Sequence, residues 1–262
     1  MNKHLNLLFV AGGILATSTS FGQMGPNSTY YLGAGNNLWT IQGTSDASAP
    51  TVTNGEFNLA VDGDIRTTQF RNSGDGQQYT LGLSPTGTTY SGTWSGIFDG
   101  TTDGRSNYTI DWDSSRVLSY DRNWQGEQTM FTLGGGGSGE YLGITYDGSG
   151  GLYVSQWNGG MIEHYTMGGQ LLGSFDTGFT NLTALAMDYS TGTLWVGSQQ
   201  HQGQFDEYTT SGTHLDTVIF GDMVVANTLG GEFDLGSAVP EPASLAVLGF
   251  GALALLRRKR AK

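Results

Sequence analysis

Residues 141–175 read YLGITYDGSGGLYVSQWNGGMIEHYTMGGQLLGSF, and this stretch decides the expected fold. Four short apolar segments, at 141–146, 152–156, 161–166 and 171–175, alternate with turns rich in Gly, Asp and Asn. Such turns join antiparallel strands tightly, because Gly and Asn accept the positive φ angles that short hairpins need. The stretch therefore predicts one sheet of four antiparallel strands.

The next segment repeats this unit with small insertions in its turns. Four matched pairs lie 41, 42, 43 and 43 residues apart, namely Asp147 and Asp188, Leu152 and Leu194, Tyr165 and Tyr208, and Gly169 and Gly212. We expect Leu152 and Leu194 to be equivalent buried positions. Upstream, at an offset of 34, Ile110, Trp112, Asp113 and Phe131 stand where Ile144, Tyr146, Asp147 and Tyr165 stand. An aromatic residue followed by Thr is expected at the end of each third strand, at 39–40, 79–80, 131–132, 165–166 and 208–209.

Residues 23–237 carry no heptad repeat and no long helical stripe, which favours an all-β domain. A period near 42 over about 215 residues predicts five units. Residues 143–155, 162–165 and 169–171 resemble one repeat of an NHL-type β-propeller. The resemblance implies a small β-propeller with a ligand surface at one end of its central channel. A β-sandwich is the alternative fold.

The composition limits the partners of this domain. The chain has 262 residues, of which 43 are Gly and none is Cys. Without Cys there is no disulfide, no cysteine nucleophile and no thiolate metal site. Residues 23–239 hold 22 acidic and five basic residues, a formal charge of −17. A surface of this charge repels polyanions, so we expect no binding to nucleic acid.

The first 22 residues have the three parts of a secretory signal peptide. Lys3 supplies the positive start, residues 7–16 the apolar stretch, and Ser20 and Gly22 the small residues before a cut. We expect export through the Sec machinery and cleavage before Gln23.

The C-terminal segment, residues 238–262, also has three parts in order. Val239, Pro240, Glu241 and Pro242 are followed by 14 uncharged residues at 243–256 and then by Arg257, Arg258, Lys259 and Arg260. The apolar part would form a transmembrane helix about 21 Å long, which is shorter than the roughly 30 Å hydrocarbon core of a bilayer. The cationic cluster favours the cytoplasmic side, which places residues 23–237 outside the membrane.

This arrangement resembles the PEP-CTERM sorting signal of Gram-negative bacteria. The resemblance rests on Pro240, Glu241 and Pro242 and covers residues 239–262. It implies recognition by exosortase, a membrane-embedded cysteine protease and transpeptidase, with cleavage near the motif. We therefore expect an inner-membrane intermediate that is transferred to the cell surface or to the extracellular polysaccharide matrix.

Candidates for catalysis or metal binding are few. The three histidines of residues 23–237 lack the spacing of a zinc site: His164, His201 and His214. A GxGxxG match at 134–139 precedes an expected strand rather than a helix, so we interpret it as an inter-blade loop. Asp pairs at 62/64, 99/103 and 111/113 could hold Ca²⁺, although Asp is a common turn former and none matches the twelve-residue calcium loop.

The six tryptophans all lie in residues 23–237. Trp112 and Trp195 fall at repeated strand positions and are expected in the inter-blade core. Trp124 and Trp157 stand beside Asn in turns, and we expect them to be exposed rings on which sugars could stack.

Together these features predict an exported, surface-sorted, non-enzymatic protein with a structural or adhesive role in the cell envelope or in exopolysaccharide. No nucleophile with its base can be assembled from the motifs, and neither a catalytic residue nor a resident cofactor is expected. Two alternatives remain open: a carbohydrate-binding propeller that uses Trp124 and Trp157, and a metal-assisted propeller lactonase or lyase that uses acidic residues at the channel.

Overall fold

A computed structural model describes residues 22–134, 137–223 and 227–237. It contains twenty β-strands and the short 3-10 helices η1 (Gln199–His201), η2 (Gly221–Met223) and η3 (Leu235–Ser237). Apart from Gly22, the predicted signal peptide lies outside the described residues, as do the predicted sorting motif and the predicted helix at 243–256. No helix within the described ranges is long and apolar enough to cross a membrane.

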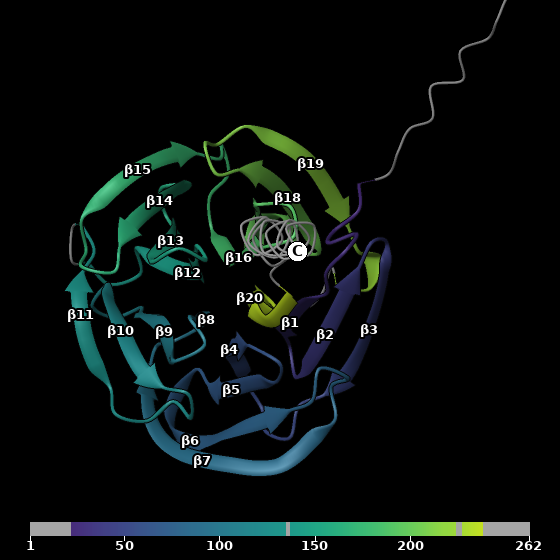
Figure 1. Ribbon diagram of the computed structural model, residues 1–262, viewed down its shortest axis with the longest axis vertical. Coiled ribbons are helices and arrows are strands. Elements are labelled where there is room, and N and C mark those ends of the chain that lie inside the picture. The colour runs from purple at the N-terminus through teal and green to yellow at the C-terminus, as the bar shows by residue number, and fades with distance from the viewer. Residues whose placement is uncertain (1–21, 135–136, 224–226, 238–262) are drawn as a thin grey trace, which may run out of the picture.

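The strands form five antiparallel sheets, the blades, around a common centre (Figure 1). From inner to outer strand, blade 1 contains β20 (Thr228–Phe233), β1 (Tyr30–Ala34), β2 (Asn37–Gln42) and β3 (Ser45–Pro50). Blade 2 contains β4 (Glu56–Val61), β5 (Ile65–Gln69), β6 (Arg71–Tyr79) and β7 (Pro85–Ser95). Blade 3 contains β8 (Gly100–Thr102), β9 (Ser106–Asp111), β10 (Arg116–Asp121) and β11 (Gln128–Thr132).

The last two blades follow the same order. Blade 4 contains β12 (Tyr141–Tyr146), β13 (Gly151–Gln156), β14 (Met161–Thr166) and β15 (Leu171–Asp176). Blade 5 contains β16 (Leu182–Asp188), β17 (Thr193–Ser198), β18 (Gln204–Thr209) and β19 (His214–Ile219). The predicted five-bladed β-propeller is confirmed, and the β-sandwich alternative is wrong.

Blade 1 closes the ring, because it combines strands from both ends of the described chain. β20 pairs antiparallel with β1, with Phe233 opposite Tyr30 and Gly231 opposite Leu32. Closure gives β20 a partner, so that blade 1 has four strands like the other blades.

The ring has two distinct faces. Each inner strand begins at what we call the upper face and ends at the lower face, and the turns between second and third strands also lie at the upper face. Both ends of the described chain lie at the lower face. Met24 forms an isolated bridge with Gly43 in the β2–β3 turn, and Asp234, directly after β20, accepts a hydrogen bond from Gly63 N–H in the β4–β5 turn (2.9 Å).

The hydrophobic core lies between neighbouring blades. Leu152 on β13 and Leu194 on β17 are both 0% exposed, and they stand opposite Tyr165 and Tyr208 on the third strands of their blades. Their predicted equivalence is confirmed, because the two blades share the same register.

The upstream repeat is shifted by one strand relative to the sequence alignment. Ile110 lies on β9, the second strand of blade 3, and not on an inner strand as Ile144 does. Phe131 lies on the outer strand β11, and not on a third strand. The inner strand β8 has only three residues, Gly-Thr-Thr, so it carries no apolar pattern that a repeat search could match.

The aromatic–Thr pairs mark the ends of three of the third strands. Tyr79, Tyr165 and Tyr208 lie at or next to the ends of β6, β14 and β18. Trp39 lies in the middle of β2, so the expectation is wrong for blade 1 as it is for Phe131. In blade 3 the corresponding place on β10 belongs to Tyr120.

Candidate functional site

Asp99, which directly precedes β8, joins four inner strands at the centre of the ring. Its carboxylate is 0% exposed. Oδ1 accepts hydrogen bonds from the N–H groups of Gly100 and Gly231 (both 2.9 Å), and Oδ2 accepts from Ile144 (3.0 Å) and Leu185 (3.1 Å). One side chain therefore connects blades 1, 3, 4 and 5.

Irregular strand pairing supplies two of these donors. The register shifts between Tyr141 and Ile144 on β12, and between Thr183 and Ala186 on β16. A bulge releases backbone groups from the regular ladder, so N–H groups of these inner strands can turn toward the centre. The bulges in β12 and β16 thus allow backbone N–H groups of both strands to bind the carboxylate of Asp99.

The hydrogen bonds use the full acceptor capacity of Asp99. Each carboxylate oxygen has about two lone pairs, and each accepts two N–H groups. Burial raises the pKa of the Asp99 carboxyl well above its usual value, and the four N–H donors act in the opposite direction because they stabilise the ionised form. We infer that Asp99 holds the ring together.

Glu232 is a second buried acid near the centre, with 1% exposure. Thr145 Oγ1 donates to Glu232 Oε2 (2.9 Å) and accepts from Met187 N–H (3.0 Å), which links blades 1, 4 and 5. Burial raises the pKa of Glu232 well above its usual value, a hydrogen bond with Thr101 lowers it, and the charge of Asp99 raises it further. The central acids are thus tied to backbone and hydroxyl groups of their neighbours.

Aromatic side chains form a continuous row at the upper face. We call this row the aromatic belt, and its members are Phe57, Phe70, Phe98, Trp112 and Trp157. Neighbouring ring centroids lie between 5.3 and 5.6 Å apart, within the range of favourable aromatic pairs. Phe57 is 8% exposed, and the other four are partly exposed. The belt crosses blades 2, 3 and 4.

A repeated backbone contact positions three members of the belt. In blades 2, 3 and 4, the residue that follows the second strand accepts a hydrogen bond from the loop that leads into the next blade. Phe70 accepts from Ile97 N–H (3.0 Å), Trp112 from Gly139 N–H (2.8 Å), and Trp157 from Asn181 N–H (2.6 Å). The belt is therefore held by the same framework that joins the blades.

A polar cleft lies next to Trp157 at the upper face. It has a volume of about 350 Å³ and is lined by Gly134, Glu140, Tyr141, Gln156, Asn158 and Gly159. Asn158 Nδ2 donates to Gly139 O (3.1 Å), and Trp157 N–H donates to Glu140 O (2.7 Å). The amide and hydroxyl groups in this cleft can donate and accept hydrogen bonds, and the carboxylate of Glu140 can accept them.

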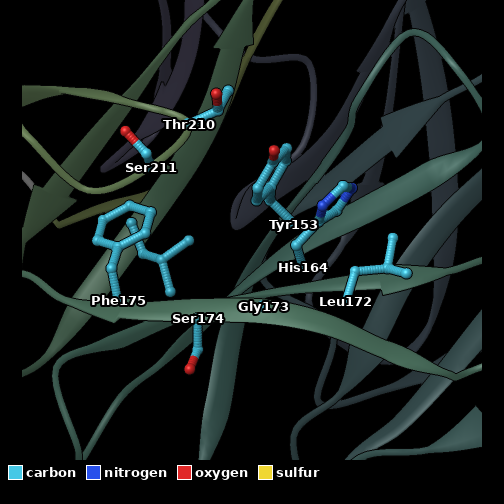
Figure 2. Close-up of a pocket in the computed structure, with 9 residues that line it drawn as sticks. Tyr153, His164, Leu172, Gly173, Ser174, Phe175, Thr210 and Ser211 are labelled. Atoms are coloured by element: carbon cyan, nitrogen blue, oxygen red, sulfur yellow. The ribbon is translucent and has the colours of Figure 1, made fainter.

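A second hollow, the inter-blade groove, lies between blades 4 and 5 (Figure 2). Its volume is about 250 Å³, and the β18–β19 turn borders it through Thr210 and Ser211. The His164 ring stacks on Tyr153 with centroids 4.1 Å apart, and His164 Nε2 lies 2.9 Å from Asp147 Oδ2.

The groove exists because the outer strand has no side chain at one position. Gly173 pairs with His164, and a Cβ atom at Gly173 would meet nothing within 4 Å. Leu172, beside it on β15, is 54% exposed. The groove is smaller than the polar cleft, and its lining residues are separate from the belt.

The predicted tryptophans lie in different surroundings. Trp124 is 1% exposed, so its expected exposure is wrong. The turn folds back on blade 2, where Trp124 Nε1 donates to Arg66 O (3.1 Å) and Trp124 O accepts from Trp94 Nε1 (3.3 Å). Trp157 is partly exposed on the belt. Trp195 is in the core as predicted, at 1% exposure, whereas Trp112 stands on the belt, partly exposed.

The histidines are separate from one another. His164 contacts Asp147, His214 Nε2 lies 3.2 Å from Asp206 Oδ1, and the His201 ring lies edge-on to Phe179 at 5.3 Å. In the GxGxxG loop, Gly136 lies outside the described residues, and the loop leads into the strand β12 as expected.

The predicted Asp pairs take part in ion pairs and turns. Asp64 pairs with Arg66 (2.9 Å), Arg122 lies 3.6 Å from Asp62, and Asp111 pairs with Arg116 (2.8 Å). Asp103 Oδ1 accepts the N–H groups of two turn residues, 105 and 106. Within the part of the chain that the structure describes, no group of three or more acidic or His side chains is placed to hold a metal ion.

Sequence reasoning missed Asp99 as the central residue and missed the belt as a unit. One signal was available, since Trp112 and Trp157 both follow a second strand and lie 45 residues apart. The shifted alignment of blade 3 hid this repeat. The role of Asp99 had no local signal, because three of the strands that donate hydrogen bonds to it, β12, β16 and β20, are remote in sequence.

Comparison with known proteins agrees with the fold. Residues 98–200 match the SMP-30/Gluconolactonase/LRE-like region family. No curated protein matches the chain. Among solved structures, the chain is similar to glutaminyl cyclase of Myxococcus xanthus, with 18% identity over 74% of this chain and 75% of that chain and a TM-score of 0.50. A chain of a nidogen/laminin complex is 13% identical over 80% of this chain and 99% of its own, with a TM-score of 0.55. At these identities the likeness concerns the fold alone.

The C-terminal segment matches a family of its own. Residues 238–260 match the PEP-CTERM protein-sorting motif, which confirms the resemblance based on Pro240, Glu241 and Pro242. The cationic residues Arg257, Arg258, Lys259 and Arg260 lie within the matched range. The chain thus carries a PEP-CTERM sorting motif after a five-bladed β-propeller, and the motif marks it as an exported protein sorted to the cell surface.

Proposed function

We propose that this protein is a non-enzymatic component of the cell surface, with an adhesive or structural role in the envelope or in the extracellular polysaccharide matrix. Exosortase would process it at residues 239–242 after export through the Sec machinery. The matched sorting motif supports this route.

One observation carries the proposal: the aromatic belt and the attached end lie on opposite faces of the ring. The described chain ends at η3, and Asp234, directly before η3, accepts a hydrogen bond from the β4–β5 turn of the lower face. Trp112 and Trp157 lie at the upper face, after second strands. A protein held through its C-terminal segment would therefore present the belt to the surroundings of the cell. Partly exposed aromatic rings are common at binding surfaces.

The family match over residues 98–200 also favours a second candidate, a metal-assisted lactonase. The central residues do not fit such a metal site. Both oxygens of Asp99 already accept two backbone N–H groups each, and Glu232 is bonded to Thr145 and to its own strand. A metal ion would have to displace these bonds, which connect the blades.

Cell attachment tests the proposed role. A deletion strain of the host should attach to a surface more weakly and retain less extracellular polysaccharide than the wild type, and the intact gene should restore both. A strain that expresses the chain without residues 238–262 should remain deficient, because the protein is then not sorted. Normal attachment of the deletion strain would contradict the proposal.

Enzyme assays separate the two candidates. The purified protein should open glucono-δ-lactone no faster than buffer does, with Ca²⁺ or Zn²⁺ added and with chelator. A metal-dependent rate that exceeds the uncatalysed one would favour the lactonase.

A further inference from the structure

We propose that the aromatic belt and the polar cleft beside it form a binding site for a neutral polysaccharide, with sugar rings stacked on Trp112 and Trp157. The inference rests on the proposed function and names the ligand of its exposed face. It differs from the site expected from sequence, because Trp124 takes no part and Trp112 does.

The two indoles offer an exposed apolar surface of suitable shape. Their centroids lie 5.3 Å apart, and their planes are nearly perpendicular, at 84°. Both are partly exposed, while Leu142 and Leu229 are buried beneath the belt, at 4% and 7% exposure. An edge-to-face pair supported from below leaves part of each indole side chain at the surface. The C–H face of a sugar ring can pack against such rings, as other apolar surfaces do.

Hydrogen-bonding groups lie directly beside this apolar surface. Glu140, Gln156 and Asn158 line the polar cleft, and two of them flank Trp157 in sequence. A sugar on the belt would have its hydroxyl groups beside two amides, which donate and accept, and one carboxylate, which accepts. Few apolar ligands would use such a cleft, whereas a polymer with an apolar face and a hydroxylated edge uses both parts.

The site is held in place before a ligand arrives. Trp157 donates its N–H to Glu140 O (2.7 Å) and accepts from Asn181 N–H (2.6 Å), which attaches the turn to the loops on either side. Trp112 is held by Gly139 in the equivalent way (2.8 Å). A site that is already ordered loses little conformational entropy on binding.

The charge of the domain selects among polysaccharides. Residues 23–239 have a formal charge of −17. Arg71, which lies 5.8 Å from the centroid of the Phe98 ring, is the cation in contact with the belt among the described residues, and Asp113 lies 4.0 Å from it. A polyanion would meet repulsion from the whole domain. The ligand is therefore neutral rather than a uronic-acid polymer.

Affinity electrophoresis of the mature protein recovered from the cell surface tests this assignment. Hydroxyethyl cellulose serves as the neutral probe and alginate as the polyanionic one. We expect hydroxyethyl cellulose to retard the wild type and alginate not to. Trp157→Ala and Trp112→Ala should each weaken binding about tenfold.

Two further variants guard against misfolding. Phe175→Ala removes a partly buried aromatic side chain in the inter-blade groove, away from the belt, and should bind as the wild type does. Asn158→Ala changes an exposed residue of the polar cleft, so it should keep the melting temperature and still bind more weakly. If the Trp variants fail to fold, Asn158→Ala decides the question.

Several outcomes would overturn the assignment. The assignment is wrong if hydroxyethyl cellulose does not retard the wild type, or if alginate retards it more than hydroxyethyl cellulose does. It is also wrong if all three site variants bind as the wild type does, or if the protein self-associates through the belt and the Trp variants abolish this association. If one of these results is obtained while the deletion strain attaches poorly, only the polysaccharide site is ruled out and the proposed surface role is still supported. Normal attachment of the deletion strain would instead remove the surface role.

Discussion

Replacement of Asp99 by Asn is expected to destabilise the ring strongly, although the two side chains have nearly the same shape. The carboxylate accepts four backbone N–H groups from four inner strands. A carboxamide keeps one oxygen, which can accept two of them, and turns an NH₂ group toward the other two. Two buried N–H donors then have no acceptor and face a donor instead.

The magnitude follows from the number of lost bonds. A buried polar group without its partner costs about 1–3 kcal/mol. Two such groups give about 2–6 kcal/mol, a large part of the roughly 5–15 kcal/mol by which folded domains are stable. Relief from burying a charge makes the loss smaller, since burial raises the pKa of this carboxyl. We therefore expect a loss of about 2–4 kcal/mol at neutral pH.

Denaturant unfolding followed by tryptophan fluorescence measures this loss. Asp113→Asn is the matched control, because the Asp113 side chain is 57% exposed and contacts only Arg71 at 4.0 Å among the ion pairs of the described residues. Its effect should stay within about 0.5 kcal/mol, as for most surface substitutions. Equal midpoints for Asp99→Asn and Asp113→Asn would refute the reasoning, because they would mean that Asp99 is a neutral acid or that the four N–H bonds carry no stability.

Other expectations concern the core, the tyrosines and the sorting motif. Leu152→Ala and Leu194→Ala should each lower the free energy of unfolding by about 2–5 kcal/mol and to a similar degree, since both are fully buried at equivalent positions. Denaturant midpoints measure both losses, and a loss at one position less than half of that at the other would contradict their equivalence. Burial raises the pKa of Tyr108 and of Tyr141 from 10.0 to about 12. Between pH 10 and 12 the unfolded chain loses these protons while the folded protein keeps them, so the free energy of unfolding should fall over this range. An absorbance titration in which all tyrosines of the folded protein ionise near pH 10 would disprove this. Glu241→Ala should leave export intact, but the full-length protein should stay in the membrane of a host that has exosortase. Immunoblots and mass spectra measure this. If the wild type and the variant have the same mature C-terminus, the protein is not processed at the motif.

The sequence by itself determined the features that depend on neighbours in the chain. Tight Gly and Asn turns between short apolar segments specify hairpins locally, so the four-strand unit of residues 141–175 and its repeat in blade 5 could be predicted. The burial of Leu152 and Leu194 followed from the same repeat. The sorting motif at 238–260 was also recognisable from sequence, because its parts follow one another in the chain.

Only the tertiary structure decided how remote segments meet. Asp99 looked like one more turn residue, since its partner Gly231 is 132 positions away and backbone N–H groups leave no trace in a sequence. Trp124 has the local context of an exposed turn, yet the acceptor of its indole N–H lies 58 residues upstream on blade 2, and this contact buries the ring. The aromatic belt likewise arises because closure of the ring places turns from three blades on one face. Local pattern thus specifies each blade, and the packing of blades around a shared centre specifies which side chains become the site.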